Sequence, residues 1–273
     1  MSDRNKKVLI IIGALVLIVV LYFQSTQIVS KKEDVAIAPG DFFNRILSQA
    51  KSSLKREELE PLKKLEADIE KGKNNKVLLL DSIAHTWQRL QVPALAAHYF
   101  EEEATLAPSE KSEMDAGANY YEAFSIAGDT ALKSFLVQGA IRNYEKVIQK
   151  NPDNLDAKAN VAMCYAEGTG NPMQGIMLLR EVVTKNPKHE NAQFDLAELS
   201  IRSGQLEKAI DRLSNVIEIN PLRYDVYFLR GSTYMRLGQK DKALNDFEKV
   251  KDEAGDAAMI SEAENSINKL KKL

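Results

Sequence analysis

The side chains that most often catalyse reactions or bind metals are few in this sequence. Its three histidines, His85, His98 and His189, have neither the His-x-x-x-His nor the His-Glu-x-x-His spacing that presents two imidazoles to one metal ion. Cys164 is the single cysteine, so the chain can form neither a multi-thiolate metal site nor an intramolecular disulfide. No Gly-x-x-x-x-Gly-Lys phosphate loop and no Gly-x-Ser-x-Gly motif is present. The sequence therefore predicts no cofactor, no bound metal and no catalytic residue.

Two enzymatic interpretations remain open beside this prediction. Cys164 and a distant histidine would make a nucleophile pair, but Cys164 lies between Met163 and Tyr165 on an expected helix, where a small buried thiol is the commoner arrangement. Carboxylates on stacked helices can also converge without any motif in the sequence. We therefore expect a protein that is not an enzyme, with an unrecognised carboxylate site as the less favoured alternative.

The overall charge indicates what the protein does not bind. The chain has 273 residues, with 37 basic against 39 acidic side chains, which gives a net charge of −2. A nucleic-acid-binding surface usually concentrates lysine and arginine against the phosphates. The sequence thus predicts no nucleic acid partner. With 44% hydrophobic and 28% charged residues, the composition is that of a folded protein.

The elements that carry these residues repeat along the chain. Asn-Pro pairs at 151–152, 186–187 and 220–221 are 35 and 34 residues apart, and aligning them brings small and apolar residues into register. Ala197 then matches Gly231, Gly204 matches Gly238, Ala209 matches Ala243, and Val216 matches Val250. The same register extends backward to Val77, with about ten added residues between 111 and 154. The pattern predicts five units of helix, turn and helix.

This pattern resembles the tetratricopeptide repeat, a 34-residue helical hairpin. The last predicted unit matches best, through Tyr227, Gly231, Tyr234, Gly238, Ala243 and Phe247, although Arg230 stands where leucine is commonest. We expect Gly231 and Ala243 to face each other where the two helices cross most closely, and Gly238 to need a positive φ in the turn. The resemblance implies an all-α superhelix with a concave inner face that binds a peptide or a helix of another protein.

Seven residues are predicted to lie on that inner face. The resemblance places the outward positions of each first helix there, and several are apolar where a solvated face would be polar, which indicates a groove for an apolar ligand segment. The predicted partner groove is formed by Met163, Phe194, Ile201, Arg202, Phe228, Met235 and Arg236. The alternative is that the segment after Gly255 forms a terminal helix that covers part of this surface. The sequence does not decide between an open groove and internal packing.

The N-terminal part reads as a membrane segment. Residues 8–23 form sixteen consecutive apolar, Gly or Tyr positions, and no charge occurs between Lys7 and Lys31. As a helix, residues 8–30 would span about 34 Å, enough to cross a bilayer. A cleaved signal peptide is less favoured, because the only small-x-small site, at 36–38, lies far beyond the run. The positive charges before it, Arg4, Lys6 and Lys7, favour the N-terminus inside and the rest of the chain outside.

These observations predict a protein with one anchor and one all-α superhelix. The predicted segments are a cytoplasmic N-terminus at 1–7, a transmembrane anchor at 8–30, a linker at 31–40, a leading helical pair at 41–76, five repeats within 77–257 (77–110, 111–154, 155–189, 190–223 and 224–257), and a C-terminal capping helix at 258–273. We expect a single-pass protein of a bacterial inner membrane, periplasmic in its folded part. It would serve as a scaffold or adaptor for a protein or peptide partner, with a self-associating homo-oligomeric scaffold as the alternative.

Overall fold

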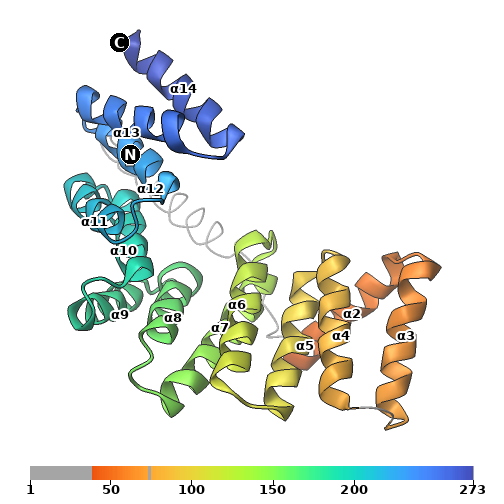
Figure 1. Cartoon of the computed structure of the whole chain (residues 1–273). Helices are drawn as coiled ribbons and strands as arrows, with labels where there is room; N and C mark the ends of the chain where they lie inside the picture. Colours follow the sequence, from red (N-terminus) through yellow and green to blue (C-terminus); the bar gives the residue numbers. More distant parts are fainter. Residues whose placement is uncertain (1–38, 73–74, 273) are drawn as a thin grey trace, which may run out of the picture. The chain divides into compact units, whose positions relative to one another are not determined.

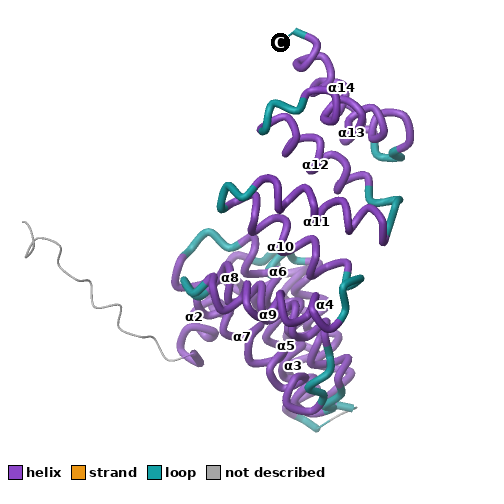
Figure 2. The backbone as a smooth tube through the Cα atoms, turned by 90° about the vertical axis from the view of Figure 1, so that its left-hand side faces the viewer, coloured by secondary structure: helices purple, strands orange, loops and turns teal. Residues whose placement is uncertain are grey.

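The structure, a computed structural model, describes residues 39–72 and 75–272, which form helices joined by short loops (Figure 1 and Figure 2). This part of the chain contains no strand, so the predicted all-α fold class is confirmed. The N-terminal segment 1–7, the anchor at 8–30 and nearly all of the linker at 31–40 lie outside the described residues. Across 39–72 and 75–272, none of the helices combines the length and the apolar composition needed to cross a bilayer.

The chain divides into two compact units between Ser52 and Ser53. The described part of the first unit is helix α2 (Pro39–Ser53) without its last residue, Ser53. The second unit begins with α3 (Arg56–Glu70) and continues to the C-terminus. Because the division falls between α2 and α3, the pairing of these two helices at 41–76 stays a prediction.

Within the second unit, helices follow one another as hairpins, and each packs on the next (Figure 1). The hairpins are α4 (Lys76–Arg89) with α5 (Pro93–Leu106), α6 (Glu110–Ile126) with α7 (Thr130–Lys150), α8 (Leu155–Gly168) with α9 (Pro172–Lys185), α10 (Glu190–Arg202) with α11 (Leu206–Ile219), and α12 (Tyr224–Arg236) with α13 (Lys240–Glu253). A last helix, α14 (Ala257–Lys271), packs on α13. The added residues of the second hairpin lengthen its helices to 17 and 21 residues and form no extra element.

The Asn-Pro pairs end three of the hairpins in the same way. The backbone N–H groups of Asn151, Asn186 and Asn220 each donate to the carbonyl four residues earlier, at 2.8 Å. Each asparagine then accepts, through its side-chain oxygen, the N–H two residues later, on the far side of the proline. Proline pushes the residue before it out of the helical region, and asparagine stabilises the resulting turn. This local chemistry explains why a turn occurs at each of the three Asn-Pro pairs.

Glycines in the turns and at the helix crossings behave differently. Gly238 has φ of +72°, so the positive φ predicted for this turn is confirmed. The predicted contact between Gly231 and Ala243 is wrong by one helical turn. A Cβ on Gly231 would lie 3.1 Å from the ring of Phe247 and 3.2 Å from Cβ of Asp246. The large ring occupies the space that the missing Cβ leaves, and Ala243 is buried one turn earlier in α13.

The apolar core from α5 to α14 includes clusters that each join successive helices. One cluster joins α5 to α8, the next joins α8 to α10, a third joins α10 to α12, and the last joins α12 to α14. Val147, Val182, Val216 and Val250, at the same place in four second helices, have no exposed surface. A single hairpin cannot bury its apolar face alone, so each unit depends on its neighbours for stability.

A buried ion pair joins three helices at the C-terminal end. Arg230, at the position where the repeat usually has leucine, donates two hydrogen bonds to Asp246 at 2.8 and 2.9 Å, and a third to Ser214 at 2.9 Å. The rings of Tyr227 and Tyr234 lie 5.6 and 5.9 Å from its guanidinium carbon. Arg230 therefore replaces an apolar contact with a polar one that links α11, α12 and α13.

Candidate functional site

The predicted groove residues lie in three places. Met163 is buried on α8 in the cluster shared by α8 to α10. Arg202, at the end of α10, is half-exposed and pairs with Glu167 of α8 through a 2.6 Å contact. Met163 lines a hollow that is described below, and Arg202 contacts Glu167, which also lines it.

Phe194 and Ile201 form the second group. Both pack against the core cluster that joins α10 to α12, and both keep only part of their surface exposed. The guanidinium of Arg223 lies over the ring of Phe194 at 5.0 Å. Arg223 is itself held by Glu190 at 2.7 Å and Asp225 at 2.6 Å. A fixed arginine thus covers one face of the Phe194 ring.

Phe228, Met235 and Arg236, on α12, form the third group. Phe228 and Met235 pack against the C-terminal cluster, to which α14 contributes Ala263, Ile267 and Leu270. The ring of Phe228 lies 5.3 Å from that of Phe247, between centroids. Arg236 is exposed. The seven predicted residues therefore do not form one continuous apolar patch.

Met163 lines a hollow of about 330 Å³, which we call the acidic cavity. It lies where the first helices of three successive hairpins meet, since α8 contacts both α6 and α10. Its lining comes mostly from these helices and includes three carboxylates, two amides and two tyrosines: Tyr121, Tyr144, Asn160, Met163, Glu167, Asn191, Asp195 and Glu198. The hollow is thus polar and acidic rather than apolar.

The carboxylates of the acidic cavity differ in their surroundings. Glu167 accepts a 2.6 Å hydrogen bond from the Tyr121 hydroxyl and the ion pair from Arg202. Burial, followed by repulsion from Glu198 and Glu167, raises the pKa of Asp195 to about 7. Burial likewise raises the pKa of Glu198, against the attraction of Arg202. Near neutral pH, Asp195 is therefore close to the midpoint of its titration.

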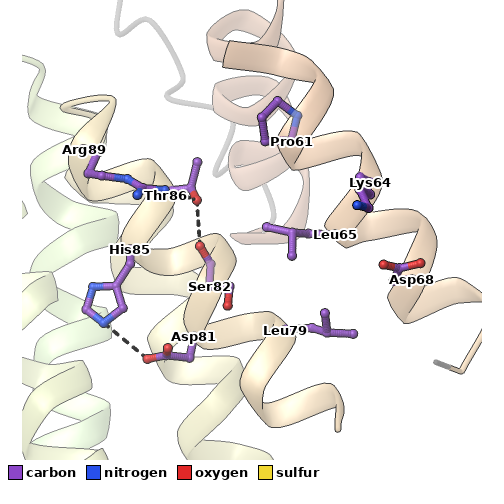
Figure 3. A pocket seen from close by; sticks show the side chains of 10 residues that line it. All are labelled: Pro61, Lys64, Leu65, Asp68, Leu79, Asp81, Ser82, His85, Thr86 and Arg89. Carbon is purple, nitrogen blue, oxygen red and sulfur yellow. Dashed lines mark hydrogen bonds and ion pairs between the residues drawn. The ribbon is translucent and has the colours of Figure 1, made fainter. Parts of the chain in front are cut away.

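A second hollow, of about 550 Å³, lies between α3 and α4 (Figure 3). Lys64 and Asp68 of α3 face Asp81, His85 and Arg89 of α4 across it. The α4 groups are already engaged: His85 pairs with Asp81 at 3.3 Å, and Arg89 donates to the Thr86 hydroxyl at 3.0 Å. The lining carries both signs of charge, so it favours no single ligand chemistry.

The residues with catalytic chemistry lie elsewhere, in structural positions. Cys164 is fully buried, and burial raises the pKa of its thiol to about 12, so little thiolate exists at neutral pH. His189 begins α10: its Nδ1 accepts the N–H of Ala192 at 3.2 Å. Within residues 39–72 and 75–272, no three His, Cys, Asp or Glu side chains are grouped so that they could hold a metal ion.

The predicted groove does not include Asn160, Asp195, Tyr121 or Tyr144. A signal for Asp195 was available. Asn191, Asp195, Glu198 and Arg202 recur at intervals of four, three and four residues, which places them on one face of α10. Of this polar stripe, the predicted groove includes only Arg202, because the prediction relies on apolar side chains as the sign of a binding surface.

Comparison with known protein families identifies the repeats. Two tetratricopeptide repeat models match consecutive stretches of the chain, at residues 168–224 and 224–255. Residues 168–255 thus match the tetratricopeptide repeat. The matched stretches cover the end of α8 and the helices α9 to α13, so the repeat family is found in the half of the chain where the sequence pattern is strongest.

Two curated proteins are similar to part of the chain in sequence. The chain is 34% identical over 97 residues to anaphase-promoting complex subunit 3 of Dictyostelium discoideum, and the match covers 34% of this chain and 10% of that protein. It is 37% identical over 79 residues to human tetratricopeptide repeat protein 16, and this match covers 29% of this chain and 9% of that protein. It thus spans about a tenth of the length of the curated relatives that it matches.

A solved tetratricopeptide repeat protein from Parabacteroides merdae aligns with a TM-score of 0.56 and 16% identity, over 84% of this chain and 87% of that one. A thermophilic tetratricopeptide repeat protein from Thermus thermophilus aligns with a TM-score of 0.53 and 14% identity, over 72% of this chain and all of the other. At these identities the likeness shows the fold alone: a superhelix of helical hairpins of the tetratricopeptide type.

Proposed function

We propose that this protein is a membrane-tethered, non-enzymatic scaffold that binds a peptide or helix of a partner protein on the inner face of its first helices. The anchor is the apolar segment at 8–30, and the folded part lies on the periplasmic side of a bacterial inner membrane. The repeat type supports a protein partner, because stacked helical hairpins commonly offer an extended surface to a peptide or helix.

The observation that carries this proposal is the acidic cavity. First helices of three successive hairpins line it, and some of its polar side chains, Asp195 and Glu198 among them, have no hydrogen-bond or ion-pair partner among the described residues. Polar groups that line a cavity are usually satisfied by a ligand or by water. The inner face around α8 and α10 is therefore where we place the partner.

Site-specific photocrosslinking tests this placement. A benzophenone amino acid replaces Asn191, an exposed residue that lines the acidic cavity, in the full-length chain in its native membrane. The matched control carries the same group at Met177, which is 65% exposed on α9 and does not line the cavity. We expect an adduct with another protein from position 191 and none from position 177.

The masses of the adducts separate the alternatives. An adduct of the chain with a different protein at position 191 supports a scaffold for a partner. An adduct of twice the chain's own mass identifies the self-associating scaffold instead. Adducts only from position 177, or none from either position, would overturn the proposal that the inner face binds a protein.

A further inference from the structure

The acidic cavity contains negative charge that the fold does not neutralise. Of its three carboxylates, Glu167 is engaged by Tyr121 and Arg202. Arg202 attracts Asp195 and Glu198 but forms its ion pair with Glu167, and no donor of the described chain makes a hydrogen bond or ion pair with Asp195 or Glu198. Two carboxylates left unpaired in partly buried positions raise the energy of the unliganded state.

Tyr144 gives a second and independent indication of a ligand. Its side chain is 2% exposed, and its ring lies against α6 where Gly117 has no Cβ: an added Cβ would come within 2.7 Å of the ring. It lines the acidic cavity, yet its hydroxyl makes no hydrogen bond with any residue that the structure describes. The hydroxyl oxygen is not sealed inside the fold but borders the open space of the cavity, where a ligand or water can hydrogen-bond to it.

The chemistry of the lining selects the ligand. The unpaired carboxylates accept hydrogen bonds and attract positive charge, and the Tyr144 hydroxyl can accept a further hydrogen bond. Met163 and the two tyrosine rings provide apolar surface for an aliphatic stem. The chain itself shows that a guanidinium is accommodated at the edge of the cavity, because Arg202 contacts Glu167 there at 2.6 Å.

We propose that the acidic cavity receives a lysine or arginine side chain of the partner segment, with Asp195 and Glu198 binding the cationic group and Tyr144 hydrogen-bonded to it. This inference rests on the proposed function and adds the class of residue that is recognised. The partner segment therefore carries at least one basic residue at a fixed position.

Binding of such a side chain depends on pH. The charged groups that act on Asp195 are Glu198 and Arg202 of α10 and Glu167 of α8, and the Tyr121 hydroxyl lies on the α6 side. Asp195 is mostly ionised at pH 8 and mostly protonated at pH 6, because its pKa is about 7. A cation binds the ionised form, so affinity for a basic segment falls as the pH is lowered from 8 to 6.

Selection from a display library of random 12-residue peptides tests the inference. The bait is the full-length chain in detergent micelles at pH 8, beside the variants Asp195→Asn and Tyr144→Phe. We expect the wild type to enrich peptides with lysine or arginine at one aligned position. The selected peptide should bind Asp195→Asn about tenfold more weakly or worse, as when one partner of a desolvated charge pair is removed. Tyr144→Phe should weaken it by a smaller factor.

A control variant and the possible outcomes distinguish the proposed peptide groove from the proposed site for a basic side chain. Glu207→Gln changes the net charge as Asp195→Asn does, but Glu207 is exposed on α11 and does not line the cavity. The Glu207→Gln variant should therefore bind the selected peptide as tightly as the wild type does. Enriched peptides without a basic position, or a basic peptide that binds Asp195→Asn as tightly as the wild type, would overturn this inference and leave the peptide groove standing. If no peptide is enriched at all, both the groove and the inference fail.

Discussion

Two aspartates of this protein have opposite surroundings. Asp246 is 5% exposed and accepts two hydrogen bonds from Arg230. The rings of Tyr227 and Tyr234, also on α12, lie beside the guanidinium of Arg230. Asp195 is also largely enclosed, but the nearest charges are mostly carboxylates, and its pKa rises to about 7. Removing one partner of a buried pair leaves the other unpaired, whereas removing a charge from a repulsive cluster relieves it. Asp246 therefore stabilises the fold, and Asp195 costs stability in the unliganded protein.

The Asp195→Asn variant should be more stable than the wild type at pH 8 and nearly equal to it at pH 4. The folded-state pKa of Asp195 lies above its unfolded value, so the wild type loses stability as the pH rises from about 4 to about 7 and keeps the full penalty above that range. Asparagine has almost the same shape and no charge. Thermal melts at the two pH values measure the difference.

The matched control for this prediction is Asp246→Asn. It breaks the pair with Arg230, so it should lower the melting temperature at pH 8, where Asp195→Asn raises it. A melting temperature of Asp195→Asn below that of the wild type at pH 8 would show that Asp195 has a stabilising partner.

The sequence predicts the helices and their turns better than it predicts the contacts between side chains. Asn-Pro turns and Gly238 act locally, through the conformations that these residues allow, so the hairpins of the repeat can be read from the sequence. Contacts across a crossing depend on which neighbour fills a space. Gly231 shows this, because its missing Cβ accommodates the Phe247 ring rather than Ala243. The acidic cavity was missed for the same reason: its lining converges from separate helices.

Gly175→Ala should destabilise the protein by about 1 to 3 kcal/mol. A Cβ at Gly175 would lie 2.2 Å from the carbonyl oxygen of Ala162, and that backbone atom of α8 cannot move without shifting the helix. The better helix propensity of alanine offsets only about 1 kcal/mol of the cost. The free energy of unfolding in urea measures the net effect.

Gly231→Ala is the comparison for this prediction. Its added Cβ would meet the Phe247 ring and the Asp246 side chain at 3.1 and 3.2 Å, and side chains can shift by a few tenths of an ångström. We expect it to lose less stability than Gly175→Ala. The reverse order would mean that the backbones of α8 and α9 do not approach most closely at Gly175.

For the whole molecule, the predicted membrane anchor rests on different observations from the fold. The tetratricopeptide repeats and the helical superhelix are found, whereas the anchor at 8–30 lies outside the described residues and stays a prediction. Apolar length and flanking charge are properties of the sequence alone, so the anchor can be predicted without tertiary contacts.

A reporter that is active only outside the cytoplasm should be active when fused after Leu273. Arg4, Lys6 and Lys7 precede the apolar run and hold the N-terminus inside. The same fusion without residues 8–30 should be inactive, because the chain then has no segment to direct it across the membrane. Activity of a cytoplasm-only reporter after Leu273 would reverse the predicted orientation.

In the second unit, helices that are neighbours in the sequence are also neighbours in the folded protein, which affects how the chain folds. Each helix from α4 to α14 packs mainly on the helices just before and after it in the chain. Contacts between residues close in sequence need little loop closure, so such chains fold rapidly. During synthesis, a hairpin that has left the ribosome can gain its stacking partner as soon as the next one emerges. Assembly can therefore proceed from the N-terminal end while the C-terminal helices are still being made.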